Sequence, residues 1–437
     1  MSKEKFSNMA VFRFVFGSFL GILFFFVKIP VNGSSVLIVD WVGNVFKALL
    51  ANYHIPLALI GSAFVLYRIV KTKSFKNSIL DMVMDGLSIT AMLMFILDAL
   101  NMLPAFIVED GTWSNAVATM IPFSISIGTI MFFLAPLICY GLPEAAGVFA
   151  QPLTRPLFKL PGVCAVTVVS AFMGNFTVGH LQTNDLYTTG KLTHKEAAIV
   201  ATGFCTSSVG LIMSICAMAG LMDRFSIIFF LIFVATMIIT SITAHIYPLS
   251  KYPSVYYDGS PAEENQRERQ EGNTFKRAFE AGVGQCVDSK PIPVMCIDFG
   301  VRAMRSVANI MISGVACNFV FSLINKYTPI FNLIGKIFYP LYKIVGFKNT
   351  DLVASAMGIN AVDNTVSQIM LATSGADPMT VFFGCGCGIL TIVFFGAFIA
   401  SLYSTKVKIK FKDLIVIWAE RTALTIVIWG LIARFLS

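Results

Sequence analysis

Two short polar interruptions lie inside apolar stretches of this sequence. Residues 170–180 read SAFMGNFTVGH and residues 355–364 read SAMGINAVDN, so Asn175 and Asn360 each lie close behind a glycine. A side-chain amide both donates and accepts hydrogen bonds, which suits the coordination of an ion or a polar solute. The alternative is that each asparagine forms a turn and caps a half-helix.

More polar residues follow each interruption. Asn364 and Gln368 are spaced to share one face of a helix. Polar side chains at bilayer depth are costly and usually mark a pathway for a solute or an ion. A lone histidine is more often a packing residue, but His180 belongs to a polar group. We therefore predict a substrate site formed by Asn175, His180, Gln182, Asn184, Asp185, Asn318, Asn360, Asp363, Asn364 and Gln368.

A run of hydroxyl residues interrupts the apolar stretch 196–219. It precedes Gly210 and predicts a partly unwound helix, whose carbonyl and hydroxyl oxygens suit Na⁺. The predicted ion site consists of Asn175, Thr206, Ser207 and Ser208, with Na⁺ as a candidate coupling ion and no other cofactor. The stretch 384–388, GCGCG, is also expected to be unwound, with close packing of small residues as the alternative. Its cysteine spacing does not fit a zinc site, so no bound metal is expected.

Charged residues inside apolar stretches form a further group. Arg302 and Arg305 are expected to anchor a helix at the membrane surface, and the alternative is contact with an anionic solute. For Asp98, Glu420 and Arg421 we expect ion pairs between helices, with a proton relay as the alternative.

The composition indicates that these apolar stretches lie in a membrane. The chain has 437 residues, of which 56% are hydrophobic and 13% are charged. Soluble domains carry about a quarter charged residues. We predict an all-α polytopic membrane protein with about nine spanning helices and two re-entrant hairpins. The spans are expected at 10–30, 54–70, 88–108, 115–141, 196–219, 225–248, 298–325, 379–404 and 413–434, with an interfacial amphipathic segment within 31–53.

The basic residues indicate a topology. The net charge of +8 is concentrated in short segments beside the spans, such as Lys406, Lys408, Lys410 and Lys412 before the last one. All basic clusters fall on one side if the N-terminus is cytoplasmic. We expect contact with membrane lipid and no nucleic-acid partner.

The two interruptions belong to an internal repeat. PLFKLPG (156–162) precedes the first and PLYKIVG (340–346) precedes the second, and MGNFTV matches MGINAV. Each interrupted run (163–189 and 350–376) is followed by a long apolar segment. An odd number of predicted spans separates the two cassettes, which predicts an inverted-topology repeat. The predicted domains are N-terminal scaffold helices (1–141), a first repeat (142–248), a polar cytoplasmic loop (249–297) with a short helix, and a second repeat with the last helix (298–437).

These cassettes resemble the nucleoside-recognition (Gate) domain family, and the chain resembles its bacterial YjiH-type members. The Gate module is also found in concentrative nucleoside transporters and in ferrous-iron transport protein B. The resemblance implies a transport fold in the bacterial cytoplasmic membrane. The sequence has no GxxxxGK[ST] phosphate loop, and it has Val178-Gly179-His180 where nucleoside carriers have a Gln-Thr-Glu cluster.

The expected function is secondary transport of a small polar organic solute, anionic or nucleoside-like, coupled to Na⁺ or H⁺. One alternative is a metal-ion permease on the same fold, with Cys385, Cys387 and His180 as ligands. Another is a subunit that requires a partner membrane protein, and a homo-oligomer is also compatible with the sequence. No HExxH or GxSxG motif occurs, so we do not expect an enzyme.

Overall fold

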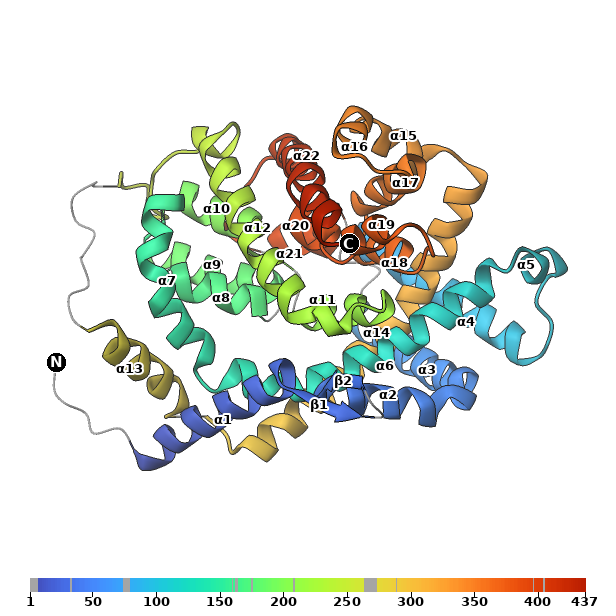
Figure 1. Cartoon of the computed structure of the whole chain (residues 1–437), viewed down its shortest axis with the longest axis horizontal. Helices are drawn as coiled ribbons and strands as arrows, with labels where there is room; N and C mark the ends of the chain where they lie inside the picture. Colours follow the sequence, from blue (N-terminus) through green and yellow to red (C-terminus); the bar gives the residue numbers. More distant parts are fainter. Residues whose placement is uncertain are drawn as a thin grey trace.

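The structure is a computed structural model of the chain. It describes residues 7–31, 34–73, 79–158, 160–161, 164–173, 176–206, 209–262, 273–287, 289–395, 397–403 and 405–437. Almost all of the regular structure is helical (Figure 1).

The first half of the chain contains α1 (Asn8–Phe26), β1 (Lys28–Val31), β2 (Ser34–Leu37), α2 (Ile38–Leu50), α3 (His54–Thr72), α4 (Ile79–Ala99), α5 (Ala105–Asp110), α6 (Thr112–Cys139), α7 (Leu142–Phe158), α8 (Cys164–Met173), α9 (Phe176–Thr188), α10 (His194–Gly203) and α11 (Val209–Met218). The second half contains α12 (Phe225–His245), α13 (Thr274–Cys286), α14 (Ile292–Tyr327), α15 (Ile330–Lys336), α16 (Tyr339–Val345), α17 (Thr350–Asn360), α18 (Asn364–Ala372), α19 (Pro378–Gly384), α20 (Cys387–Thr391), α21 (Ala397–Tyr403) and α22 (Phe411–Leu436).

The outer surfaces of several helices are apolar. On α1, Phe12, Phe16 and Phe19 are 55%, 41% and 56% exposed. Contiguous apolar surface of this kind is rare on a soluble monomer and is stable in lipid. Among the described residues, four helical segments are long and apolar enough to cross a membrane: Asn8–Phe25, Trp41–Thr72, Met222–His245 and Phe411–Leu436. The chain is therefore an α-helical membrane protein, and its further spans and its orientation stay predictions.

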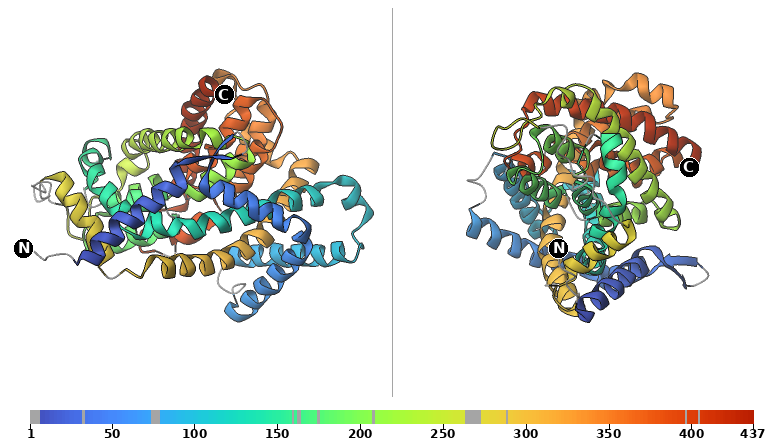
Figure 2. Two further views of the ribbon diagram at one scale, coloured as in Figure 1. Left: turned by 60° about the horizontal axis from the view of Figure 1, so that its bottom comes forward. Right: turned by 90° about the vertical axis from the view of Figure 1, so that its left-hand side faces the viewer.

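The N-terminal helices form one layer with α14. The long helices α6 and α14 pack along each other, and α14 also contacts α3 and α4. Figure 2 shows this layer from two further directions, and in Figure 1 the layer follows the lower edge, opposite α15, α16 and α17. The predicted domain boundary at 298 is not tested by these contacts, although α14 lies with the scaffold helices over much of its length.

A small β-hairpin was not predicted from the hydropathy pattern. β1 and β2 pair antiparallel, with Lys28 opposite Leu37 and Val31 opposite Ser34. The amphipathic segment predicted within 31–53 is thus part hairpin and part helix, and α2 continues through a single turn at Ala51–Tyr53 into α3.

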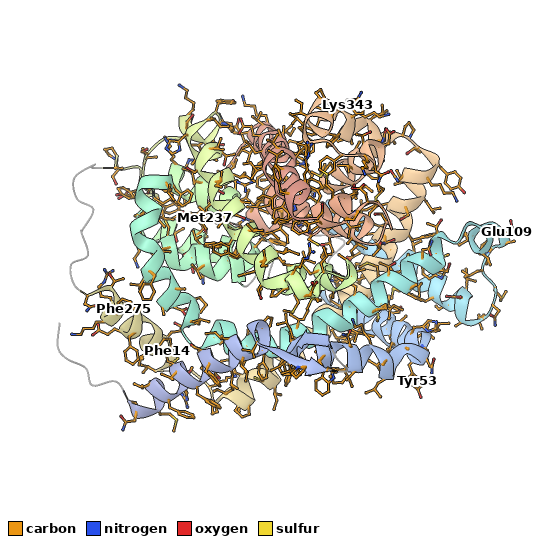
Figure 3. All side chains as sticks on the ribbon, viewed as in Figure 1. Phe14, Tyr53, Glu109, Met237, Phe275 and Lys343 are labelled. Carbon is orange, nitrogen blue, oxygen red and sulfur yellow. The ribbon has the colours of Figure 1, made fainter. Side chains whose placement is uncertain are left out.

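The polar connection 249–297 contains the expected short helix, α13. This helix packs against α1 and α7, where Phe14 and Phe279 meet edge to face at 5.6 Å between ring centroids. Figure 3 labels Phe14 and Phe275 at this junction. Ala278, Val283 and Cys286 on α13 are buried, so the helix is anchored to the membrane helices although it has no core of its own.

The two cassettes have the same order of elements. Each has helices before the interruption (α7; α15 and α16), two short helices around it (α8 and α9; α17 and α18), a second broken helix (α10 and α11; α19 to α21), and a long apolar helix (α12; α22). The unwinding predicted at Thr206 is confirmed, because α10 ends at Gly203 and α11 begins at Val209. The run 379–404 is broken twice, briefly at Cys385–Gly386 and more extensively after Thr391.

A close helix crossing supports the second interruption. A Cβ on Gly358 of α17 would lie 1.9 Å from the carbonyl oxygen of Phe331, and one on Gly335 of α15 would lie 1.8 Å from the carbonyl oxygen of Ala354. Only glycine permits so close an approach of two backbones. The glycine of the MG-N motif in this cassette therefore has a packing role.

Candidate solute-binding site at the helix breaks

Three helix breaks meet inside the molecule. Thr206, in the break between α10 and α11, donates from Oγ1 to the carbonyl oxygen of Ile389 on α20 at 2.8 Å. Ala361, in the break between α17 and α18, accepts from the amide of Phe395, in the break after α20, at 2.7 Å. The first break is thus bonded to the short helix α20 of the second cassette, and the two breaks of the second cassette are bonded to each other.

The contacts between the cassettes are reciprocal. In the first cassette, α9 contacts α10 of its own broken helix and α21 of the other cassette. In the second cassette, α18 contacts α19 and α20 of its own broken helix and α11 of the other cassette. Each interruption therefore packs against the first part of the broken helix in its own cassette and against the last part of the broken helix in the other cassette.

Asn360 lies at the centre of a buried polar network. Its side chain is 0% exposed, donates from Nδ2 to Ser367 Oγ at 3.0 Å, and accepts from Thr391 Oγ1 at 2.8 Å. Asp363 caps α18, since its Oδ1 accepts from the amides of Thr365 at 2.8 Å and Val366 at 3.0 Å. Helix capping was the alternative role considered for Asn360, but in the structure the cap of α18 is Asp363, three residues later.

The next turns of α18 pack closely on the second broken helix. Asn364 donates to the carbonyl oxygen of Gly388 at 3.4 Å, and Gln368 donates from Nε2 to the carbonyl oxygen of Cys385 at 3.3 Å. A Cβ on Gly388 would lie 2.6 Å from the carbonyl oxygen of Asn364. The stretch 384–388 is thus unwound at Cys385–Gly386, as predicted, and its glycines also serve the close packing that was the alternative. Gln368 Oε1 is buried and has no hydrogen-bond partner in the described part of the chain.

The polar residues of α9 fall into two groups. His180 is buried, with Nδ1 2.9 Å from Ser401 Oγ on α21 and Nε2 3.3 Å from the carbonyl oxygen of Ala201 on α10. Gln182 has a buried Oε1 that makes no hydrogen bond to any residue the structure describes. Towards the end of the helix, Asn184 accepts from the backbone amide of Lys406 at 2.8 Å, and Asp185 is exposed.

Aromatic rings line the approach of the two cassettes near His180. Phe176, the first residue of α9, lies 5.9 Å from Phe394 between ring centroids, and His180 lies 4.8 Å from Phe398. Phe394 belongs to the break after Thr391, which is called the second break below, and Phe398 belongs to α21. The first interruption therefore also faces the broken helix of the other cassette.

Several predicted residues lie apart or outside the described part. Asn318 is on α14, and Ser322 donates to its Oδ1 at 3.5 Å, one turn away. Asn175, Ser207 and Ser208 lie outside the described residues, as do the side chains of Arg302 and Arg305. The structure thus brings Asn360, Asp363, Asn364, Gln368 and Thr206 to one region, with His180 and Gln182 on the adjoining helix α9.

The ion pairs predicted for Asp98 and Arg421 are absent among the described residues, and the larger departure from the prediction is at Arg421. It is 0% exposed on α22 and donates to the carbonyl oxygens of Leu390 and Thr391, at distances of 3.0 to 3.2 Å. No ion pair involves Arg421 among the described residues. Asp98 likewise accepts from Trp113 Nε1 at 3.0 Å, where an ion pair was expected. The only sequence signal for Arg421 was a basic residue deep in an apolar helix.

The metal-permease alternative finds no ligand cluster in the described part of the chain. No group of three or more His, Cys, Asp and Glu side chains there could hold a metal ion. Cys387 Sγ lies 3.8 Å from the carbonyl oxygen of Gly384, and both ring nitrogens of His180 are engaged as above. The set of Cys385, Cys387 and His180 is therefore not assembled.

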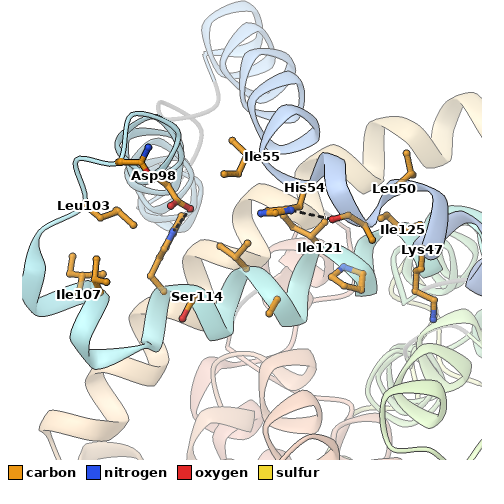
Figure 4. Close-up of a pocket in the computed structure, with 17 residues that line it drawn as sticks. Lys47, Leu50, His54, Ile55, Asp98, Leu103, Ile107, Ser114, Ile121 and Ile125 are labelled. Atoms are coloured by element: carbon orange, nitrogen blue, oxygen red, sulfur yellow. Dashed lines mark hydrogen bonds between the residues drawn. The ribbon is translucent and has the colours of Figure 1, made fainter.

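Two adjoining cavities lie near this region, the larger among the scaffold helices and the smaller between the scaffold and the cassettes. The larger, about 730 Å³, is bounded by α2, α3, α4 and α6, and the smaller, about 250 Å³, reaches Ala217 and Met218 on α11 and Thr373 beside α18. Lys47, Ala118 and Pro122 line both. Figure 4 shows Lys47 at one end of the larger cavity and Asp98, Leu103 and Ile107 at the other. The larger cavity does not touch the predicted site residues, whereas the smaller one ends next to α11 and α18.

Comparisons with known proteins give a limited context. No protein-family model matches the chain. It is 25% identical over 330 residues to "Uncharacterized protein BpOF4_10220" of Alkalihalophilus pseudofirmus, covering 74% of this chain and 70% of that protein.

Among solved structures, the chain is similar to a CNTnw variant in an outward-facing state, at 14% identity and a TM-score of 0.43, and to CNTnw in an inward-facing substrate-bound state, at 13% identity and a TM-score of 0.39. Each match covers 100% of this chain and 94% of the other. These scores are too low to support an inference about function.

Proposed function

We propose that this chain is a secondary transporter of a small polar organic solute, with its binding site where the three helix breaks meet. The observation that carries the proposal is the convergence of the breaks after Gly203, Asn360 and Thr391. Irregular backbone at membrane depth is stable only where it is buried in protein or lines a cavity, and broken helices of this kind form the solute sites of transporters.

The reciprocal contacts between the cassettes support an inverted repeat with re-entrant hairpins. If α8 and α9 correspond to α17 and α18, a two-fold relation exchanges α10 with α19 and α20, and α11 with α21. The contacts of α9 and α18 follow this exchange. Such a repeat provides two equivalent packings of one fold, which is the basis of alternating access.

Two buried amide oxygens mark where a solute would bind. Oε1 of Gln182 and Oε1 of Gln368 have no hydrogen-bond partner among the described residues, although each belongs to a helix that borders a break. An unpaired buried polar atom costs about 1–3 kcal/mol. A solute with hydroxyl or amino donors would remove this cost. The smaller cavity beside α11 and α18 provides an approach, and Lys47 at its edge favours a solute with an anionic group.

The test is solute-dependent thermal stabilisation of the purified protein. Wild type, Gln368→Ala and Gln285→Ala would be compared against a panel of small metabolites with and without Na⁺. Gln285 is an exposed glutamine on α13 and serves as the matched control. A stabilising solute should raise the unfolding temperature of wild type and Gln285→Ala, and raise that of Gln368→Ala by a smaller amount, because binding to the folded state stabilises it by mass action.

For each variant, the unfolding temperature with solute is compared with that of the same variant without solute. A general loss of stability in Gln368→Ala therefore does not affect the result. Equal shifts in all three proteins would place the solute elsewhere. A response to divalent metals alone would favour the permease alternative, and uptake of the identified solute into proteoliposomes would separate transport from binding.

A further inference from the structure

The side chain of Arg421 places a positive charge at the edge of the second break, where α20 ends. The guanidinium of Arg421 donates from Nε to the carbonyl oxygens of Leu390 and Thr391, both at 3.2 Å, and from Nη2 to that of Leu390 at 3.0 Å. Its Nη1 lies 3.2 Å from Thr240 Oγ1 and 3.5 Å from Thr243 Oγ1 on α12. Backbone carbonyls and threonine hydroxyls therefore surround one positive charge.

The adjacent carboxyl group does not neutralise this charge. Glu420 Oε2 is buried but has no hydrogen-bond partner, and no ion pair between Glu420 and Arg421 is present in the described structure. Neighbouring residues of a helix point about 100° apart, since 3.6 residues make one turn. Among the described residues, the hydrogen-bond partners of Arg421 are thus all neutral oxygen atoms.

This set of oxygens is the kind that binds Na⁺ at broken membrane helices. Unwound carbonyls at the end of a half-helix, together with hydroxyl groups, coordinate alkali cations in transporters. Leu390 and Thr391 provide such carbonyls where α20 ends, just before Ile392, which has a positive φ of 58°. Thr391 Oγ1 also bonds to Asn360, so the same turn connects to the second interruption.

We propose that the guanidinium of Arg421 is a fixed cation in the place that a dissociable Na⁺ takes at other broken helices. The second break is then held together by an internal charge at every stage of the cycle. A coupling Na⁺, if the proposed transport uses one, binds outside this break. The reference to coupling depends on the proposed function, but the assignment of Arg421 as a structural cation does not.

The first arm of the test asks whether charge or shape matters at this position. Arg421→Lys keeps a positive charge without the planar fork of donors, and Arg421→Gln keeps hydrogen-bond donors without the charge. We expect Arg421→Lys to retain most of the wild-type thermal stability and Arg421→Gln to lose it. Equal losses in the two variants, including failure of both to fold, would overturn the proposal.

The second arm asks whether a free cation can replace the arginine. In Arg421→Ser, Na⁺ should raise the unfolding temperature by several degrees between about 1 and about 100 mM, at constant ionic strength set with choline chloride. Wild type measured in parallel accounts for any Na⁺ site elsewhere. A folded Arg421→Ser protein whose response to Na⁺ equals that of wild type would contradict the proposal.

Neither arm uses a solute. A protein that transports nothing would still give the expected stability differences, and a transporter whose arginine only fills space would not. Failure of this inference and failure of the proposed function are therefore distinguishable.

Discussion

The break between α10 and α11 (the first break) and the break after Thr391 (the second break) are bonded to the rest of the molecule in different ways. In the first, the described part of the break contributes one side-chain bond to the other cassette, from Thr206 Oγ1 to Ile389. At the edge of the first break, Thr240 Oγ1 donates to the carbonyl oxygen of Gly203 at 2.7 Å. In the second, Arg421 and Asn360 bind Thr391 at the edge of the break, and the amide of Phe395 within the break donates to the carbonyl oxygen of Ala361. Among the described residues, the second break therefore has more buried polar contacts than the first. From this difference we expect the second break to be the fixed part of the proposed site, and the first to be the part whose opening costs less.

The largest effect is expected from Arg421→Met. This change removes three buried hydrogen bonds from the guanidinium to the carbonyl oxygens of Leu390 and Thr391, of which the second keeps its bond from the amide of Val393. The free energy of unfolding should therefore fall by roughly 3–5 kcal/mol. Denaturation in detergent with circular dichroism measures the loss. Arg434→Met on the same helix removes one bond to the carbonyl oxygen of Val345 near the surface and should cost about 1 kcal/mol. Similar losses in both variants would remove the special status of the second break.

An intermediate effect is expected from Gly388→Ala. The new Cβ would lie 2.6 Å from the carbonyl oxygen of Asn364, so α18 and α20 must separate, at a cost of about 1–3 kcal/mol. The matched control is Gly86→Ala on α4, where nothing lies within 4 Å of the added atom and the helix should gain up to about 1 kcal/mol. A stable Gly388→Ala protein would show that the second break can relax.

The smallest effect is expected from Thr206→Val. It removes the bond to Ile389 and should lower the free energy of unfolding by about 1 kcal/mol, since a neutral hydrogen bond contributes about that amount. Thr90→Val, which removes an exposed bond to the carbonyl oxygen of Gly86, should have a smaller effect. If Thr206→Val costs as much as Arg421→Met, the two breaks are equally fixed and the comparison fails.

Much of the architecture could be predicted because it depends on hydropathy and local sequence. The unwinding at Thr206 followed from three consecutive hydroxyl residues before a glycine, a pattern that weakens a helix on its own. Several predicted polar residues meet in the structure for the same reason, since they lie at fixed distances from Asn360 along one chain segment. The hairpin of β1 and β2 was missed, although the sequence has an Asn-Gly pair at 32–33, a favoured hairpin turn, between the two strands.

The role of Arg421 could not be predicted in the same way. Its main partners are backbone carbonyls, which every residue has, and they lie about thirty positions away along the chain. Sequence reasoning looks for an oppositely charged side chain, and in the described structure none is paired with Arg421. The position of the main break in the last cassette was also missed, because the glycines at 384, 386 and 388 have a packing role that their sequence alone does not distinguish from unwinding.

The crossing of α15 and α17 has a mechanical consequence. With Gly335 and Gly358 in direct contact with the opposite backbone, the two helices cannot slide or rotate against each other without a steric clash. We expect the two helices to move as one rigid unit, so that a displacement of the buried end of α17 is transmitted to α15. Leu333 on α15 is 59% exposed, so a spin label or fluorophore attached there would report from the periphery on the position of a segment that no probe can reach directly.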